Sequence, residues 1–200
     1  MAKLYFRYGA MGSGKSALLL QAAYNYEAQG MKVFIMKPII DSKADDCIIS
    51  RIGIKRKVDY LVKEDDNLFE YFKNIDSDIQ CIFVDEVQFL NPIQVDQLMQ
   101  VVTILEIPVI CYGLRTDFKT KGFPAASRLL EIAHTIEEIK TICKCGKKAM
   151  FNARRVNGKF LFTGDQIAID EKNNVTYEAL CPKCYYHKLE QYDKIKSNLK

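Results

Sequence analysis

The sequence lacks the features that place a chain in a membrane or in a repetitive assembly. No apolar run among its 200 residues approaches the length of a membrane span, and the N-terminus has no charged-then-apolar leader. There are no internal repeats and no low-complexity segments. A net charge of +4 is too small to indicate nucleic-acid binding by itself. We therefore expect a cytoplasmic protein with no membrane partner, built as one medium domain and a small appendage.

The seven cysteines fall into two groups. Cys47, Cys81 and Cys111 are scattered, and the last two lie in apolar runs that predict buried thiols. The other four form two close pairs in the last third of the chain, Cys143-Lys144-Cys145 and Cys181-Pro182-Lys183-Cys184. Four thiolates predict a structural zinc site, with iron–sulfur ligation as the less favoured alternative. A disulfide framework is not expected, because a cytoplasmic compartment keeps thiols reduced.

Positive charge is concentrated around the first cysteine pair. Residues 140–160 contain seven basic side chains and no acidic one: Lys140, Lys144, Lys147, Lys148, Arg154, Arg155 and Lys159. Zinc held by four thiolates carries a net charge of about −2, which nearby lysines would offset. Nucleic-acid binding explains the same charges equally well. One metal tying both pairs would also close the intervening residues into a loop able to fold over a ligand.

The segment Gly9-Ala10-Met11-Gly12-Ser13-Gly14-Lys15-Ser16 matches the phosphate-loop pattern G-x-x-x-x-G-K-S/T. A predicted strand precedes it and a predicted helix follows it, which is the context in which such loops bind phosphate. Backbone N–H groups would converge on the anion at the start of the helix. Lys15 would reach the β- and γ-phosphates, and the Ser16 hydroxyl suits Mg²⁺. The pattern predicts binding of a nucleoside triphosphate.

Asp85-Glu86-Val87-Gln88 follows a short apolar run and supplies the second half of that site. A carboxylate after a buried strand predicts that Asp85 holds Mg²⁺. Glu86 is the candidate general base for the attacking oxygen, and Gln88 could hydrogen-bond a phosphate or reach across the site. We count Val87 with them as part of the nucleotide-binding segment. On this chemistry alone a kinase and an ATPase are both open.

Strands and helices alternate along the first two thirds of the chain, which predicts a P-loop (RecA-like) α/β fold with a mostly parallel sheet. Predicted strands are 3–8, 31–37, 58–62, 81–84 and 107–112, and predicted helices are 17–29, 67–74, 91–105 and 124–132. Residues 134–142 are predicted as a strand leading out of the sheet. Residues 39–57 are expected as a loop, Asn157-Gly158 as a hairpin turn and the last dozen residues as a frayed end.

These motifs together resemble the cytosolic, zinc-containing (type II) thymidine kinases over nearly the whole chain. The resemblance rests on Gly9–Ser16, Asp85–Phe89, Tyr112–Phe118 and the two cysteine pairs. It implies transfer of the ATP γ-phosphate, with Mg²⁺, to the 5′-hydroxyl of thymidine or deoxyuridine in pyrimidine salvage, with Glu86 as the base. It also implies a homotetramer inhibited by dTTP.

Beyond residue 142 the sequence changes to short strands, lysines and paired cysteines, so we expect a nucleotide-binding domain over 1–140, a zinc-binding domain over 141–192 and a flexible tail over 193–200. The resemblance implies that the second domain is a zinc-ribbon-like lasso. The lasso of the family covers the nucleoside. The implied contacts to thymine are Met11, Phe89, Leu114, Phe118, Phe123, Ile167, Ile169 and Tyr177. Two positions depart from the family: Ile169 is followed by Asp170–Thr176 without the usual two glycines, and Lys43 replaces an arginine whose planar fork grips phosphate.

Two other functions stay open on the residues themselves. A nucleic-acid-stimulated ATPase would use Asp85 and Glu86 with the basic cysteine module as a grip, although two helicase lobes would not fit in 200 residues. A non-catalytic nucleotide-binding regulator would form a stable complex without turnover.

Overall fold

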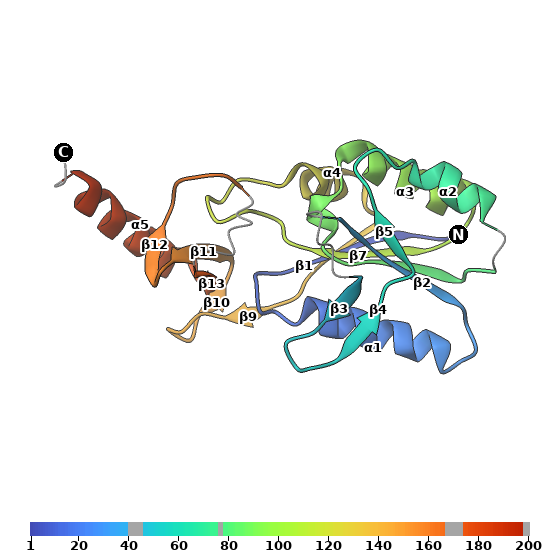
Figure 1. Ribbon diagram of the computed structural model, residues 1–200, viewed down its shortest axis with the longest axis horizontal. Helices are drawn as coiled ribbons and strands as arrows, with labels where there is room; N and C mark the ends of the chain where they lie inside the picture. The colour runs from blue at the N-terminus through green and yellow to red at the C-terminus, as the bar shows by residue number, and fades with distance from the viewer. Residues whose placement is uncertain (40–45, 76–77, 167–173, 198–200) are drawn as a thin grey trace. The chain divides into compact units, whose positions relative to one another are not determined.

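The computed structural model describes residues 1–39, 46–75, 78–166 and 174–197, which form two compact units (Figure 1). The sheet unit comprises Met1–Tyr8, Gly14–Arg115 and Phe123–Ile139. The cysteine unit comprises Gly9–Ser13, Thr116–Gly122 and Lys140–Lys200. None of the helices in the described ranges is long and apolar enough to cross a membrane.

A six-stranded sheet forms the frame of the sheet unit. Its order is β5-β2-β6-β7-β1-β8, and every pairing is parallel. The strands are β1 (Leu4–Tyr8), β2 (Val33–Pro38), β5 (Tyr60–Val62), β6 (Cys81–Val84), β7 (Val109–Gly113) and β8 (Thr135–Glu138). Every residue of β6 and β7 is buried, because central parallel strands are covered on both faces.

Helices cover both faces of this sheet (Figure 1). On one face lie α2 (Leu68–Asn74), α3 (Pro92–Ile104) and α4 (Pro124–Ile132), and on the other lie α1 (Lys15–Glu27) and the hairpin of β3 (Cys47–Ile49) and β4 (Lys55–Lys57). Successive side chains of a strand alternate between faces. Phe34 and Met36 of β2 therefore join the core under α2–α4, whereas Val33 and Ile35 join the core with α1. The predicted mostly parallel sheet flanked by helices is confirmed.

Local sequence signals explain where two helices begin. The Asn91 side chain accepts a hydrogen bond from the Gln94 N–H, and the Gln94 side chain accepts one from the Asn91 N–H, which forms a capping box ahead of α3. Pro92 occupies the first helical position of α3, as predicted. The Asn67 side chain caps α2 by accepting from the Glu70 N–H over 3.1 Å.

The cysteine unit is built around a small antiparallel sheet. Its central strand β11 (Phe151–Val156) pairs with β12 (Lys159–Leu161) and β13 (Val175–Leu180), and a separate ribbon joins β9 (Thr141–Ile142) to β10 (Lys148–Ala149). The predicted Asn157-Gly158 hairpin is confirmed, since both residues have positive φ as such turns require. Helix α5 (Pro182–Ser197) contributes Tyr185 to the core of this unit.

Three expectations about local structure are wrong. The described part of 39–57 contains the β3–β4 hairpin, because Ile48 is buried in the core beside α1. Residues 134–142 form β8 and β9, which belong to different sheets, rather than one strand. The described part of the last dozen residues is helical rather than frayed, and it includes five residues of the expected tail. Leu189 and Tyr192 of α5 pack against the core of the cysteine unit and hold this helix.

Candidate active site

The phosphate loop runs from the end of β1 to the start of α1, as predicted. Gly14 precedes the helix in a left-handed conformation, with φ of 83°, which glycine adopts at little cost. Because Gly14 has no side chain, α1 begins without a side-chain cap, the arrangement in which a helix N-terminus can receive an anion. The Ser13 hydroxyl is buried and has no hydrogen-bond partner among the described residues. The loop therefore offers donors that a phosphate would satisfy.

Lys15 is the first residue of α1 and is buried. Burial lowers the pKa of its ammonium group, while the negative charges of Glu86 and Asp85 act in the opposite direction. Two carboxylates thus lie close enough to Lys15 to affect its charge. The three side chains form one electrostatic group at the start of α1 and the end of β6.

Ser16 and Asp85 form the candidate magnesium site. The Ser16 hydroxyl donates to Asp85 Oδ2 over 3.0 Å, whereas Asp85 Oδ1 is buried with no partner in the described part of the chain. Burial and repulsion from Glu86 raise the pKa of Asp85. Mg²⁺ prefers hydroxyl, carboxylate and water oxygens, so this donor set fits the ion, and Asp85 Oδ1 is an acceptor that a metal-bound water could satisfy.

Glu86 is held in a defined position after β6. Its backbone is left-handed, with φ of 50°, a costly conformation for a residue with a side chain and one found at functional sites. The short helix η1 (Val87–Phe89) follows, and Gln88 Nε2 donates to Glu86 Oε2 over 2.5 Å. Gln88 Oε1 in turn accepts from the Leu114 N–H over 2.9 Å. A half-buried carboxylate fixed in this way can accept a proton.

Val87 and Gln88 belong to η1, and both side chains contact other parts of the protein. The sequence left open whether Gln88 bonds a phosphate or reaches across the site; its side-chain amide bonds Glu86 and Leu114 and is buried. The Val87 side chain packs in the core under α2–α4, which leaves its backbone groups for a nucleotide. The sequence contained no signal for the contact of Gln88 with Leu114, because these residues are 26 positions apart and meet only in the folded sheet.

The predicted thymine contacts fall in both units. In the sheet unit, the rings of Phe89 and Phe123 pack edge to face with centroids 5.7 Å apart, and both join the same core as Leu114. Phe89 also lines a cavity of about 250 Å³ with Pro38 and Pro124. Ile167 and Ile169, together with Lys43 and the altered segment after Ile169 up to residue 173, lie outside the described residues.

The cysteine unit contains the remaining predicted contacts, Met11, Phe118 and Tyr177. The Met11 N–H donates to Asn152 Oδ1 over 2.8 Å. The Arg154 guanidinium lies over the Phe118 ring, 3.6 Å from its centroid, and its Nε donates to the Tyr177 hydroxyl over 3.2 Å. Asn152 and Arg154 are buried residues that sequence reasoning missed. Their spacing of two on one strand, which places both on one face, was the only available signal.

The four paired cysteines come together as predicted. The Sγ atoms of Cys143, Cys145, Cys181 and Cys184 all lie within 4.8 Å of one another, an arrangement that could hold a metal ion. The Cys184 N–H donates to Cys181 Sγ over 3.5 Å and lowers the pKa of that thiol, which favours the metal-binding thiolate. Cys81 and Cys111 are buried in the sheet unit, as expected, and burial raises the pKa of Cys81 to about 12.

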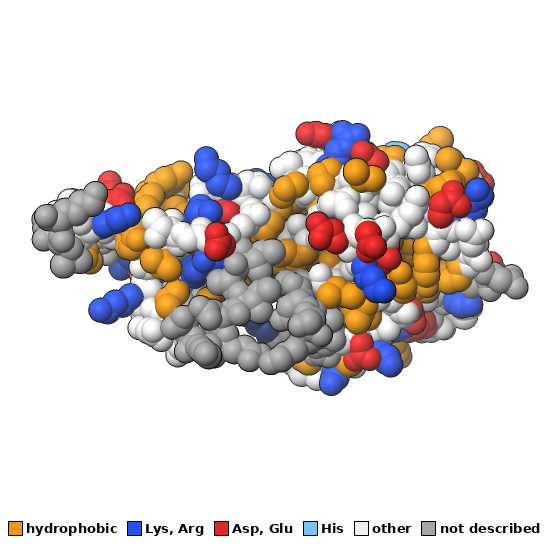
Figure 2. All heavy atoms as spheres, turned by 45° about the horizontal axis from the view of Figure 1, so that its top comes forward, with side chains coloured by type: hydrophobic (Ala, Val, Ile, Leu, Met, Phe, Trp, Pro, Cys, Tyr) orange, Lys and Arg blue, Asp and Glu red, His pale blue; other side chains and the backbone are white. Residues whose placement is uncertain are grey.

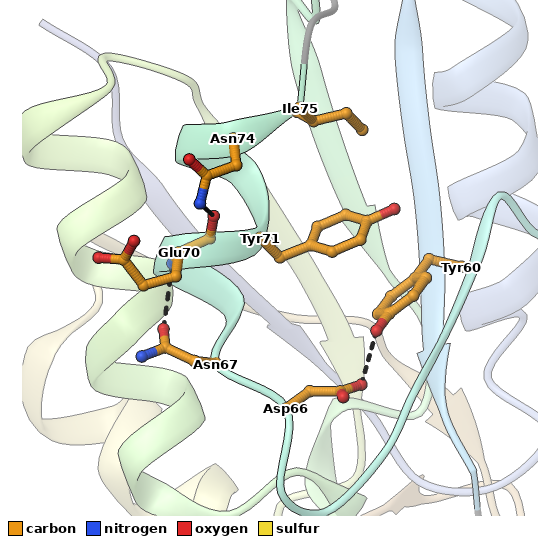
Figure 3. Close-up of a pocket in the computed structure, with 7 residues that line it drawn as sticks. All are labelled: Tyr60, Asp66, Asn67, Glu70, Tyr71, Asn74 and Ile75. Atoms are coloured by element: carbon orange, nitrogen blue, oxygen red, sulfur yellow. Dashed lines mark hydrogen bonds between the residues drawn. The ribbon is translucent and has the colours of Figure 1, made fainter.

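A separate cavity of about 460 Å³ lies beside α2 and β5 (Figure 3). Tyr60 and Tyr71 stack at one side of it with ring centroids 4.3 Å apart, and the Tyr60 hydroxyl points toward Asp66. None of the predicted site residues lines this cavity.

The family model and the curated relatives indicate one family. A model described as thymidine kinase matches residues 2–185. Thymidine kinases of Francisella tularensis and Enterobacteria phage T4 are each 45% identical to this chain, and each alignment covers 92% of this chain. The alignments cover 96% of the Francisella enzyme and 95% of the phage enzyme. A thymidine kinase of Streptococcus agalactiae is 41% identical, and the alignment covers 94% of this chain and 98% of that enzyme. A solved structure of the replication initiator DnaA bound to AMPPCP and single-stranded DNA aligns with 70% of this chain and with 41% of the DnaA chain, at 19% identity. Its TM-score is 0.42, which is too low to indicate a shared fold.

Proposed function

The chain belongs to the thymidine kinase family, and from that premise we propose that it transfers the γ-phosphate of ATP to the 5′-hydroxyl of thymidine, giving dTMP, and accepts deoxyuridine as well. The observation that carries this proposal beyond family membership is the fixed position of Glu86. Gln88 donates a hydrogen bond to its carboxylate, and the side chains of Lys15 and Asp85 lie close to it. Ser16 in turn donates to Asp85. A base beside a phosphate loop is what a phosphotransferase with a hydroxyl acceptor requires.

The triphosphate would bind at Gly9–Ser16. Backbone N–H groups at the start of α1 and the Ser13 hydroxyl would donate to its oxygens, and Lys15 would pair with the β- and γ-phosphates. Ser16 and Asp85 would hold Mg²⁺, which when bound supplies positive charge to the phosphate oxygens. Because phosphoryl transfer depends mainly on positioning and electrostatics, these fixed groups supply most of what the reaction needs.

Glu86 would accept the proton of the 5′-hydroxyl as that oxygen attacks the γ-phosphorus, while the bond from the γ-phosphorus to the β–γ bridging oxygen breaks and ADP leaves. One of its carboxylate oxygens is bonded to Gln88, which orients the group and leaves the other oxygen for the acceptor. The role requires a deprotonated carboxylate.

The nucleoside would contact Met11, Phe118 and Tyr177 from the cysteine unit and Phe89, Leu114 and Phe123 from the sheet unit, with Ile167 and Ile169 as further contacts. Zn²⁺ at the four cysteines would be structural and would tie the segment around β9 to the start of α5. We extend the proposal to a homotetramer in the cytoplasm, inhibited by dTTP and serving pyrimidine salvage for DNA synthesis.

The nucleic-acid-stimulated ATPase is the second candidate, and the charges around the cysteines speak against it. Lys144 and Arg155, two of the seven basic residues of 140–160, both contact the Glu178 carboxylate, at 3.2 and 3.4 Å. On the face shown in Figure 2, acidic and basic side chains of the described residues are interspersed. Part of the basic stretch is therefore neutralised within the protein.

A direct assay separates the candidates. Purified protein is incubated with Mg-ATP and one nucleoside at a time, and nucleoside monophosphate and ADP are measured with and without single-stranded DNA. We expect thymidine and deoxyuridine to be phosphorylated, purine nucleosides to be poor acceptors, and DNA to have no effect. ADP release that requires DNA and yields no nucleotide product would favour the ATPase instead.

A further inference from the structure

Arg154 is a buried cation in the middle of the cysteine unit. It lies on the central strand β11 and its exposed fraction is 2%. No carboxylate of the described residues pairs with it. Burying a charge without a partner of opposite charge costs free energy unless polar groups surround it. The presence of an arginine at this position is therefore not explained by packing alone.

Its contacts connect three parts of the proposed acceptor site. The guanidinium carbon lies 3.6 Å from the centroid of the Phe118 ring, and Nε donates to the Tyr177 hydroxyl over 3.2 Å. Nη2 donates to two backbone carbonyls, those of Asp165 at 2.8 Å and Gln166 at 3.1 Å.

The topology explains why one side chain reaches all of these groups. Arg154 pairs with Leu161 of β12 on one side and with Tyr177 of β13 on the other. Leu161 is the last residue of β12, and Asp165 and Gln166 follow shortly after it, whereas Tyr177 lies within β13. Arg154 thus links the chain after β12 and the strand β13 to the ring of Phe118.

We propose that Arg154 is the positioning residue of the acceptor side: it holds Phe118, Tyr177 and the carbonyls of Asp165 and Gln166 in the arrangement that receives the nucleoside base. This inference rests on the proposed function. Arg154 acts through those groups, so its loss weakens nucleoside binding and leaves the phosphate loop unaffected. Only a planar guanidinium can lie flat on a ring while it donates in two in-plane directions, so lysine cannot replace it.

The test compares Arg154→Lys with Arg155→Lys, the same change at the next residue. Arg155 is a third exposed, pairs with Glu178 and lies over the Phe160 ring, outside the proposed site. We expect Arg154→Lys to raise the KM for thymidine about 10- to 100-fold, the range for losing hydrogen bonds from a charged group. The KM for ATP and the zinc content should stay as in the unmodified enzyme, and Arg155→Lys should change neither KM by more than about twofold.

Tyr177→Phe extends the test, because it removes one hydroxyl and disturbs the fold little. It should raise the KM for thymidine alone, and its effect should largely disappear in the Arg154→Lys background, since the hydrogen bond is already lost there. An unchanged KM for thymidine in Tyr177→Phe, or in folded Arg154→Lys, overturns the inference. So does an equal rise of both KM values, which would indicate a general structural role. If the unmodified enzyme phosphorylates no thymidine, the proposed function itself fails.

Discussion

The Ser16 hydroxyl donates a hydrogen bond to Asp85 over 3.0 Å and thereby joins the first turn of α1 to the end of β6. The bond satisfies one oxygen of the carboxylate and leaves the other buried without a partner in the described structure. Asp85 is also next to Glu86, whose negative charge adds to the cost of ionising it. A bound divalent cation would give the second oxygen a partner and would offset the repulsion from Glu86. We therefore interpret Ser16 and Asp85 as the ligands of a cation.

Asp85→Asn tests this interpretation, because it removes the charge while keeping the shape of the side chain. We expect the Mg²⁺ concentration for half-maximal activity to rise about tenfold or more, since a carboxylate ligand is lost. The metal-free protein should be as stable as the unmodified one or more so, because a neutral amide costs less to bury than a charge. Activity measured against Mg²⁺ at fixed ATP, with thermal melts in EDTA, checks both; an unchanged Mg²⁺ requirement would remove Asp85 from the metal site.

Glu86→Gln tests the proposed base. The amide is the same size but cannot accept the proton of the 5′-hydroxyl, so kcat should fall about 10²- to 10⁴-fold while ATP affinity is largely retained. Steady-state rates with thymidine, together with equilibrium ATP binding, separate the two effects. Glu190→Gln on the exposed side of α5 is the matched control and should behave like the unmodified enzyme. Near-normal turnover in Glu86→Gln would contradict the role.

Gly113→Ala tests whether Gln88 positions that base. A Cβ at Gly113 would lie 2.5 Å from Gln88 Oε1 and 2.9 Å from Val87 Cγ1, so Gln88 would have to move and release Glu86. We expect kcat to fall about tenfold or more, and stability to fall by about 1–3 kcal/mol through overpacking. Urea unfolding and steady-state kinetics measure the two changes.

Gly158→Ala provides the control for this substitution. A Cβ there meets no atom within 4 Å, but φ of +79° makes any side chain strained, so the variant loses about 1 kcal/mol of stability. Its kcat should nevertheless be normal. An equal loss of kcat in both variants would mean that destabilisation, rather than the position of Gln88, reduces the rate.

The contrast between Glu86 and Gln88 shows what the sequence could and could not predict. Glu86 was identified because its chemistry follows from its own residue type and its neighbours in the chain. The Gln88 contact to Leu114 and the Arg154 contact to Phe118 join residues 26 and 36 positions apart, and no local pattern marks them. The parallel sheet was predictable because each strand carries its own apolar run, whereas the β3–β4 hairpin contacts the rest of the sheet unit through Ile48 in the core and Arg56 on Glu27 of α1.

Cys181→Ser tests the metal site. Removing one of four thiolates should abolish stable binding of about one zinc ion per chain, and thymidine kinase activity should be lost with it. Elemental analysis of the purified variant and the nucleoside assay give the two readouts. Cys47→Ser, outside the cluster, is the control and should keep both. A fully active variant without zinc would contradict a structural role for the metal.

The protonation of the Tyr60 hydroxyl should make the free energy of unfolding depend on pH in the alkaline range. This hydroxyl donates to Asp66 over 2.8 Å, and burial together with that carboxylate raises the pKa of Tyr60 to about 12 (Figure 3). In the unfolded chain the pKa is about 10. As the pH rises, the unfolded chain therefore loses the Tyr60 proton first. Between about pH 10 and about 12 the folded protein still holds that proton. The stabilisation is fully present below about pH 10 and is lost as the pH rises to about 12.

Tyr60→Phe should make that decline shallower, because phenylalanine has no proton to lose. The free energy of unfolding, measured by urea denaturation at intervals from pH 9 to about 11.5, should fall less steeply in the variant than in the unmodified protein. Tyr24→Phe removes an exposed hydroxyl and should leave the slope unchanged. Since Tyr60 is only partly buried, the difference in slope should be small but of definite sign, and a steeper decline in Tyr60→Phe would show that the Tyr60–Asp66 bond does not hold the proton.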